Sequence, residues 1–356
     1  MAGLLRAGYS DERAADLPLI TPAARAGGTA LSATALSATA LSAVGMAVVR
    51  VPKGDAAGFW RGRSALADGR IWLDGVRAPS VDRGVPRVGA PTAWRAWLMD
   101  GPDAPEASPL VGEACAPRGC LESTIIAGMA GAARAGAKVV TLGVGGLDTG
   151  GDPLGDDLLE IAVNRLSAAH GTLFVVAAGD GGGGAERVSS PANANAVLAV
   201  GGTAMAAQVA EAAATVARRR RHWTGARIAS ALLGSAAPSG FGRVDVGRAV
   251  AQTGYTEPAS VAMGTQPWPH EDDPVVTKTV TYHNTEDQAV TFRLSLTGSD
   301  APAGMFRLSA GEIAVPAHGT ASVDVSADTA LPAPDGVFSA RVLAEAGARR
   351  ITTRCG

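Results

Sequence analysis

Two short apolar runs in the middle of the chain, Val139–Val144 and Thr172–Ala178, are bounded by glycine. Almost every residue in them is apolar, as in strands that are covered on both faces of a parallel sheet. Between residues 196 and 201 a third apolar run, shorter still, follows a loop rich in glycine. These runs predict three neighbouring strands of one buried sheet.

The segments Ser123–Ala135 and Leu154–Ala169 carry apolar residues three and four positions apart. This spacing predicts two amphipathic helices that cross over between the strands. Asp152–Pro153 before the second helix and Gly171 after it mark its two ends. The alternation of helix and buried strand indicates an α/β fold.

After about residue 251 the apolar positions alternate with a period of two, first in Val276–Tyr282 and then in Ala289–Leu296. Further strands are predicted at Phe306–Ser309, Glu312–Val315, Ala321–Ala327 and Val337–Ala344. Short strands separated by regular turns are typical of an antiparallel β-sandwich. Trp268 and Tyr282 are predicted to lie in its core, and His270 with Glu271–Asp273 is interpreted as a solvated turn rather than a cation site.

The N-terminal region is less regular. Val48–Val51 is predicted as a strand, Phe59 and Trp60 as the start of a short helix, and Ile71–Gly75 as a strand that enters an Asp-Gly turn. The pentad TALSA occurs three times in Thr29–Ala43. A period of five fits neither a helix nor a strand, so this repeat is predicted to be flexible or poorly packed.

The composition excludes several classes of function. A net charge of −2 on 356 residues gives no electrostatic reason to expect nucleic acid as a partner. The sequence has no run of 18 or more strongly apolar residues, so no membrane span is predicted. No cofactor or metal motif is present, and the start of the chain lacks the apolar core of a signal peptide. Cys115 and Cys120 are close enough for a small disulfide loop, but two free thiols fit the spacing equally well.

The amino-acid sequences of three segments are more informative than their pattern of apolar and polar positions. AGAKVVTLGVGG (135–146), AVNRLSAAHGTLFVVAAGD (162–180) and SSPANANAVLAVGG (189–202) resemble the central part of secreted actinobacterial subtilisin-like serine proteases. The resemblance implies a subtilisin-like parallel sheet. It places Asp180 where the family has the asparagine of the oxyanion hole. Gly143, Val144 and Gly145 then stand in the family's substrate-binding strand.

The same resemblance implies that the catalytic groups are missing. Ala204, within GTAMAAQVAE (202–211), stands where the family has its nucleophilic serine. In the family, the motifs that carry the catalytic aspartate and histidine follow the segment that resembles Met99–Gly101. In this chain, only eight residues separate Gly101 from LVGEACAPRGCLES (110–123), and neither motif is present there. Asp148 and His170 occur in the chain order of the triad. They are interpreted as a loop acid and a helix-end histidine, because their surroundings do not match the family motifs.

The two ends of the chain extend the resemblance. IWLDG (71–75) and VPRVGAPTAW (85–94) are similar to the end of the family's propeptide and the start of its mature domain. The C-terminal strands are similar to the fibronectin type III-like domain that follows the catalytic domain. The implied organisation is a propeptide-like segment (1–78), a truncated subtilisin-like α/β domain with two internal gaps (79–252) and a fibronectin type III-like β-sandwich (260–350).

Three hypotheses on function follow. The chain is a subtilisin-like relative without catalytic activity, a binding or inhibitory protein that acts through its propeptide-like segment or its β-sandwich, or a hydrolase that uses other residues. The resemblance implies a polypeptide substrate or a sibling protease as partner. It also implies an extracellular location, whereas the N-terminal sequence leaves a cytoplasmic one open. The stability of the shortened sheet is itself in question, because lost strands leave apolar faces without partners.

Overall fold

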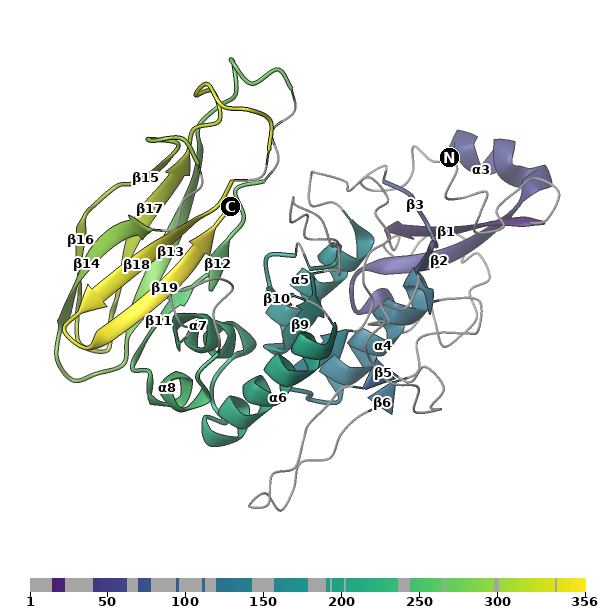
Figure 1. The fold of residues 1–356 in the computed structure, drawn as a ribbon. Coiled ribbons are helices and arrows are strands. Elements are labelled where there is room, and N and C mark those ends of the chain that lie inside the picture. The colour runs from purple at the N-terminus through teal and green to yellow at the C-terminus, as the bar shows by residue number, and fades with distance from the viewer. Residues whose placement is uncertain are drawn as a thin grey trace.

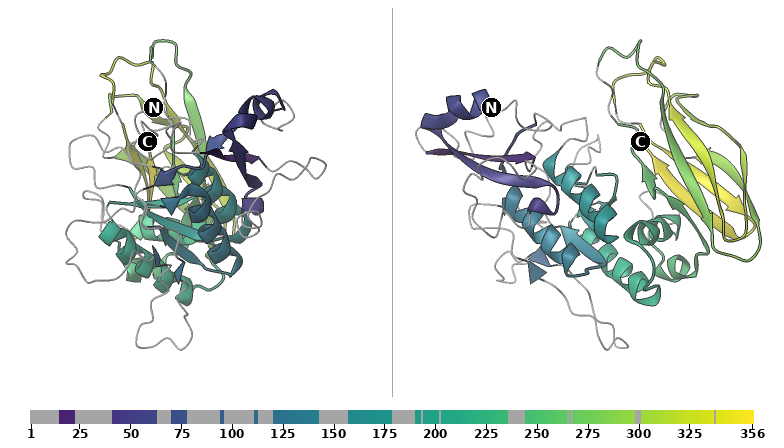
Figure 2. Two further views of the ribbon diagram at one scale, coloured as in Figure 1. Left: turned by 90° about the vertical axis from the view of Figure 1, so that its right-hand side faces the viewer. Right: turned by 180° about the vertical axis from the view of Figure 1, so that it is seen from behind.

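The computed structural model has three parts that follow one another in space as they do in the sequence (Figure 1). A small N-terminal sheet lies at one end, helices around a parallel sheet form the middle, and a β-sandwich lies at the other end, an order that is also clear in both views of Figure 2. The structure describes residues 15–22, 41–62, 70–77, 94–95, 111–112, 120–142, 157–178, 190–192, 194–201, 203–235, 244–264, 266, 268–297, 301–336 and 338–356.

The N-terminal sheet is antiparallel and has the order β2-β1-β3. Its elements are β1 (Asp16–Pro22), β2 (Met46–Pro52), the 3-10 turn η1 (Lys53–Asp55), α3 (Ala56–Gly62) and β3 (Trp72–Leu73). Successive residues of a strand point to opposite faces. Leu19 accordingly clusters with Phe59 of α3, whereas Ile20 clusters with the helices of the middle part. The strand and the short helix predicted here are β2 and α3.

The TALSA repeat differs in part from the prediction. Residues 29–40 lie outside the described part of the chain. Leu41, in the third copy, is fully buried, and so is Val44 just after it. Both belong to the apolar cluster of the middle part. The end of the repeat is therefore well packed, because its leucine reaches a core that the repeat pattern by itself does not reveal.

The middle part contains a parallel sheet of three described strands in the order β10-β9-β8. Its elements are α4 (Glu122–Arg134), β8 (Val139–Leu142), α5 (Leu158–His170), β9 (Leu173–Ala177), β10 (Val197–Val200), α6 (Thr203–Arg219), α7 (Gly225–Ser235) and α8 (Val246–Ala251). Two short antiparallel pairs precede the sheet, β4 (Val76–Arg77) with β7 (Cys120–Leu121) and β5 (Trp94–Arg95) with β6 (Val111–Gly112).

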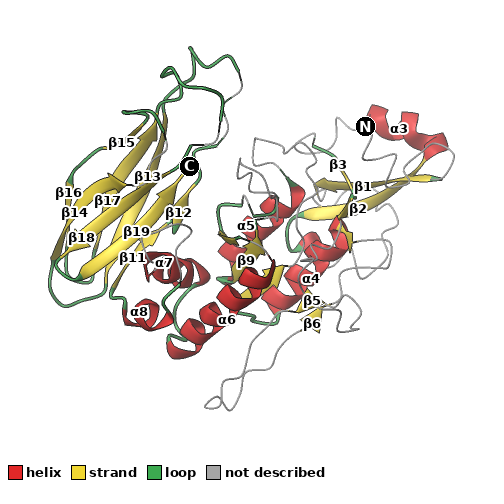
Figure 3. Ribbon diagram, viewed as in Figure 1, coloured by secondary structure: helices red, strands yellow, loops and turns green. Residues whose placement is uncertain are grey.

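Helices cover the sheet on both faces (Figure 3). In β9, Phe174 and Val176 belong to the cluster that contains α4 and α5, whereas Leu173, Val175 and Ala177 belong to the cluster that contains α6 and α7. All five residues of this strand are buried. The near-continuous apolar runs were a correct sign of a parallel sheet covered on both sides.

Glycine allows α7 to approach the sheet closely. A Cβ atom on Gly225 would lie 2.5 Å from the backbone nitrogen of Leu173 in β9. The Gly225 N–H donates a 2.8 Å hydrogen bond to the carbonyl of Gly171, the left-handed residue that ends α5. The start of α7 is therefore held at the edge of the sheet where β9 begins.

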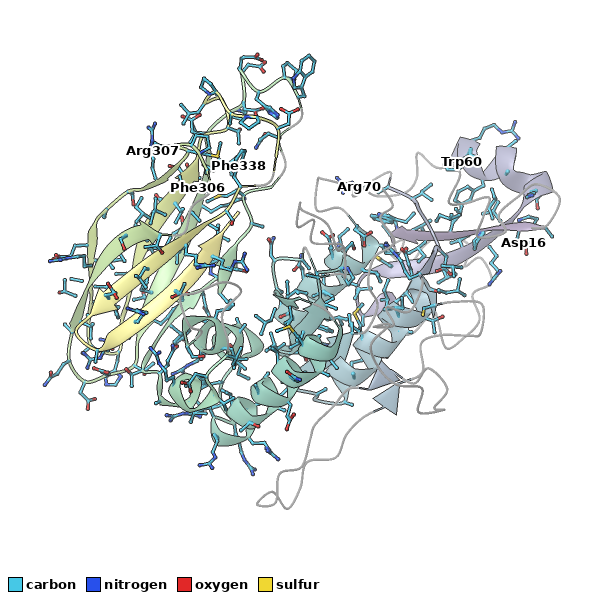
Figure 4. All side chains as sticks on the ribbon, viewed as in Figure 1. Asp16, Trp60, Arg70, Phe306, Arg307 and Phe338 are labelled. Carbon is cyan, nitrogen blue, oxygen red and sulfur yellow. The ribbon has the colours of Figure 1, made fainter. Side chains whose placement is uncertain are left out.

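The C-terminal part is a β-sandwich of two sheets, with the orders β11-β13-β17-β15 and β12-β19-β18-β14-β16. Its strands are β11 (Gly254–Glu257), β12 (Ser260–Val261), β13 (Val276–Asn284), β14 (Val290–Thr297), β15 (Phe306–Leu308), β16 (Glu312–Val315), β17 (Thr320–Ala327), β18 (Ala340–Ala346) and β19 (Arg349–Cys355). All pairs are antiparallel except β12 with β19. Phe306 and Phe338 lie close together at the end of the sandwich away from α8 (Figure 4).

The prediction for the sandwich core was right for one aromatic residue and wrong for the other. Tyr282 in β13 is fully buried. Trp268 is 78% exposed and lies eight residues before the alternating pattern begins at Val276. Its size suggested a core position, but the strand that would turn it inward has not yet started at this point.

The sandwich is attached to the middle part through buried hydroxyl groups. The Ser230 hydroxyl of α7 accepts a 2.8 Å hydrogen bond from the Thr256 N–H of β11, and the Thr256 hydroxyl lies 3.1 Å from that of Thr353 in β19. All three residues are buried. Buried polar groups that satisfy one another fix the relative position of the elements that carry them. Among the helices that the structure describes, none is long and apolar enough to cross a membrane.

Candidate functional site

The carboxyl ends of the three described strands lie at one edge of the parallel sheet. Carboxyl ends of parallel strands meet at the same edge, which is where α/β proteins bind their ligands. Gly143, Val144 and Gly145 directly follow β8, Asp180 follows the end of β9, and Ala204 follows β10. In the sequence, each of the three segments therefore comes after the carboxyl end of one strand. Gly143–Gly145 and Asp180 lie outside the described residues, so only Ala204 has a described backbone position.

Ala204 is the second residue of α6, which begins shortly after β10 ends. The helix then runs back along the sheet, so that its last residue, Arg219, lies toward the opposite edge. A helix N-terminus offers free N–H groups and a partial positive charge. Alanine has no atom that could act as a nucleophile at this place.

None of the five histidines in the sequence lies at the carboxyl edge. His170 is the exposed last residue of α5, just before β9, and so lies at the amino edge. His222 lies between α6 and α7, whose start is bonded to Gly171 at the same amino edge. His270, His283 and His318 belong to the sandwich. His170 is thus a helix-end residue, as predicted, and Asp148 lies outside the described part.

A buried group of charges lies beside the carboxyl edge. Both α4 and α5 run antiparallel to the strands that follow them, so their N-termini lie at this edge. The Arg77 guanidinium reaches from β4 to both helices. Its Nε donates to Glu122 Oε1 at 2.6 Å, and its Nη2 donates to Asp157 Oδ2 at 2.7 Å. The other oxygen of Asp157 caps α5 by accepting from the Leu159 N–H.

Asp74 makes the corresponding contact with the first turn of α4. Its two carboxylate oxygens accept from the N–H and the hydroxyl of Ser123, at 2.9 Å and 2.7 Å. Asp74 and Arg77 thus link the segment 71–77 to the N-termini of two helices. Such contacts satisfy helix N–H groups that have no partner within the helix.

The group contains more acid than base. Burial is the main cause that raises the pKa of Glu122 to about 7, and the neighbouring Asp157 and Asp74 carboxylates raise it further, against the attraction of Arg77. Burial also raises the pKa of Asp74, against the two hydrogen bonds from Ser123. Burial therefore outweighs the attraction of Arg77, and Glu122 binds a proton more tightly than an exposed glutamate does.

This arrangement positions elements and has no reacting groups aimed at a substrate. The Ser123 hydroxyl is bonded to Asp74 and is only 5% exposed. No imidazole lies at this edge to activate it. The group was not predicted, because Asp74 and Arg77 occur in a short turn-like segment whose partners lie 49 and 45 residues away. The Asp-Gly turn predicted at Ile71–Gly75 was the single signal in this segment.

The turn at His270 and the three cysteines were the other candidate sites. His270 Nδ1 lies 2.9 Å from Asp273 Oδ2, which also accepts from the Thr329 hydroxyl, so the turn is closed by its own side chains. Within the described ranges, no group of three His, Cys, Asp or Glu residues could hold a metal ion. Cys120 is disulfide-bonded and Cys355 is a buried free thiol, while Cys115 lies outside the described residues.

Comparison with known proteins gives one family. Residues 102–229 match the model of the subtilase family, Peptidase_S8. This range contains α4, α5, α6 and the whole described parallel sheet. No curated protein matches the chain.

Comparison with solved structures gives only weak likeness. WR4, an MSP family member of C. elegans, has 13% identity and a TM-score of 0.22 over 29% of this chain and 95% of its own. A PapD-like domain of human CEP192 has 17% identity and a TM-score of 0.22 over 29% and 83%. At such TM-scores the likeness does not assign a fold.

Proposed function

We propose that this chain is a relative of the subtilisin-like serine proteases that does not hydrolyse peptide bonds. The observation that carries the proposal is that Ala204 is the second residue of α6 at the carboxyl edge and that no histidine lies there. Serine proteolysis requires a hydroxyl nucleophile, an imidazole that removes its proton, and an acid that orients the imidazole. No histidine lies at this edge, and by the resemblance Ala204 occupies the position of the serine.

The expected loss is large. In subtilisin itself, removal of the serine or the histidine alone lowers kcat by about 2 × 10⁶. The Asp180 position adds a further obstacle, because an ionised carboxylate repels the negative charge that an oxyanion hole should stabilise. Loss of one neutral donor there costs roughly 3 kcal/mol in subtilisin. With the serine and histidine absent, only the small residual rate that binding supplies is expected, and a charged Asp180 lowers it further.

The test uses the full chain and its Ala204→Ser variant with casein as substrate. We expect no cleavage by either protein, because a serine without an imidazole remains a weak nucleophile. Circular dichroism shows whether both are folded. Cleavage by the unchanged chain would refute the proposal. Cleavage that appears in Ala204→Ser would show that a base is present at the site after all.

A second candidate is favoured by the attachment of the N-terminal sheet. Ile20, Leu41 and Met46 share one apolar cluster with α4 and α5, and Asp74 and Arg77 bind the N-termini of these helices. A propeptide-like segment that binds such a helix pair within its own chain could bind the same pair in a sibling protease. Titration of an active subtilisin-like protease with the full chain tests this, and unchanged protease activity at equimolar chain would exclude it.

The proposal also includes the domain organisation, the location and the partner of the protein. The organisation is a propeptide-like segment, a shortened subtilisin-like domain and a fibronectin type III-like sandwich, and the location is extracellular. The disulfide at Cys120 supports an oxidising compartment, where such bonds persist. A polypeptide remains the proposed partner of the carboxyl edge.

A further inference from the structure

Four side chains form a stacked column where α7 meets the sandwich, at the amino edge of the parallel sheet. The guanidinium carbon of Arg227 lies 4.3 Å from the ring centre of Trp223 and 4.5 Å from that of Tyr255. On the far side of Arg227, the Tyr255 ring stacks on His283 at 4.4 Å with an angle of 9°. Arg227 is therefore clamped between two aromatic rings that come from different parts of the fold, the turn before α7 and strand β11.

The Arg227 guanidinium is held by these rings and not by hydrogen bonds. Its Nε is buried without an acceptor among the described residues, and no described carboxylate pairs with it. The charge of Glu257 acts on Arg227, but its carboxylate pairs with His283, with Oε2 3.4 Å from Nε2. The side chain is half-buried, and its two terminal nitrogens make no hydrogen bond within the described residues. A planar fork of donors is thus fixed in place while its polar edge stays unused.

A second guanidinium lies next to the first. Arg220 is 5.4 Å from the centre of the same Trp223 ring, and both its Nε and its Nη2 donate to the carbonyl of Val250. Burial lowers the pKa of Arg227 and the charge of Arg220 lowers it further, against the attraction of Tyr255 and Glu257. Trp223 is only 3% exposed, and its indole N–H also has no acceptor within the described chain. The surroundings offer donors and positive charge with few acceptors.

We propose that Arg220 and Arg227 form a binding site for a doubly charged oxyanion of the phosphate class. Arginine forks bind phosphate oxygens in pairs, and such charge-assisted bonds are stronger than neutral ones. A dianion would neutralise the two adjacent guanidinium groups, which now repel each other. Clamping by the rings lowers the entropy cost of binding, because the Arg227 fork is already oriented.

The site is separate from the proposed protease remnant. Arg227 lies in the first turn of α7, at the amino edge of the sheet. Ala204 lies in the first turn of α6, at the carboxyl edge; both helices are labelled in Figure 1. Both the middle part and the sandwich contribute to it. Its occupation would therefore link these two parts, whatever the carboxyl edge does.

The test is calorimetric titration of the full chain with inorganic phosphate at a pH where it is mainly a dianion, and with acetate as the singly charged comparison. We expect one phosphate per chain and weaker binding of acetate. Arg227→Gln and Arg220→Gln should each lower the phosphate affinity about tenfold or more. Arg227→Lys should also lower it, because a lysine keeps the charge but not the fork.

Arg219→Gln is the matched control, since Arg219 is an exposed arginine in the last turn of α6. It should change the affinity less than about twofold. An equal loss in Arg219→Gln would mean general attraction to the basic helix end and would overturn the proposal. So would the absence of phosphate binding up to about 10 mM, or equal binding of acetate. Thermal unfolding of each variant without phosphate separates lost binding from lost folding.

Discussion

Glu122 should make the protein less stable as the pH rises from mildly acidic to neutral. Its carboxyl group is buried between Arg77, Asp157 and Asp74, and burial raises its pKa from 4.5 to about 7. The folded state therefore binds a proton more tightly than the unfolded state does. Stability from this group is fully present below about pH 4.5 and is lost as the pH passes through about 7. The rise of the Glu122 pKa from 4.5 to about 7 corresponds to about 3 kcal/mol of unfolding free energy.

Glu122→Gln tests this value because glutamine resembles the protonated acid at every pH. Its side-chain oxygen can still accept the hydrogen bond that Arg77 Nε donates to Glu122 Oε1. We expect the variant and the unchanged chain to have similar unfolding free energies at pH 4.5, and the variant to be more stable by up to about 3 kcal/mol at pH 8. Urea unfolding at a series of pH values, followed by circular dichroism, gives both curves.

The control is Glu211→Gln, which removes an exposed carboxylate of α6. It should leave the pH dependence unchanged. The reasoning is refuted if Glu122→Gln keeps the pH slope of the unchanged chain, or if it destabilises the protein at pH 8. Either result would mean that attraction to Arg77 outweighs burial and that Glu122 is charged throughout.

Two further predictions concern packing. Gly225→Ala should destabilise the protein by about 1–3 kcal/mol or more, because the new Cβ would lie 2.5 Å from the Leu173 nitrogen; Gly128→Ala, where the Cβ meets nothing within 4 Å, is the control, and thermal unfolding compares the two. Trp268→Ala should change the unfolding free energy by less than about 0.5 kcal/mol, whereas Tyr282→Ala should cost about 3–5 kcal/mol, and equal effects in urea unfolding would contradict the exposed position of Trp268.

The middle part could be predicted well because its buried strands are apolar at every position. Leu173–Ala177 lies within the predicted strand Thr172–Ala178, and Gly171 ends α5 as expected. The start of α5 was predicted too early. The Asp157 side chain accepts from the Leu159 N–H and so caps the first turn of α5. The prediction had instead placed the start of the helix directly after Asp152–Pro153.

Three strands of the sandwich, β11, β12 and β19, were not predicted, and two of them turn a threonine inward. Thr256 of β11 and Thr353 of β19 are fully buried and satisfy each other's hydroxyl groups. Thr256 is the one buried residue of β11, and Thr353 of β19 lies between the buried Ile351 and Cys355, so neither strand shows an unbroken apolar alternation. Sequence periodicity detects buried positions only where they are apolar.

The charged group at the helix N-termini and the Arg227 column could not be predicted for a related reason. Arg77 meets Asp157 across 80 residues, and Arg227 meets Tyr255 across two structural parts. Contacts of this kind depend on how the elements assemble. The absence of the nucleophilic serine, in contrast, is a prediction from one position, Ala204, and it rests on the resemblance of the surrounding residues to the family.

A fluorophosphonate probe tests the absence of catalytic groups most directly, since it modifies serines that an adjacent base has activated. The purified chain is incubated with the probe before and after heat denaturation, and modified residues are identified by mass spectrometry. We predict that no serine is modified in either sample. Stoichiometric modification of one serine that disappears on denaturation would contradict the account.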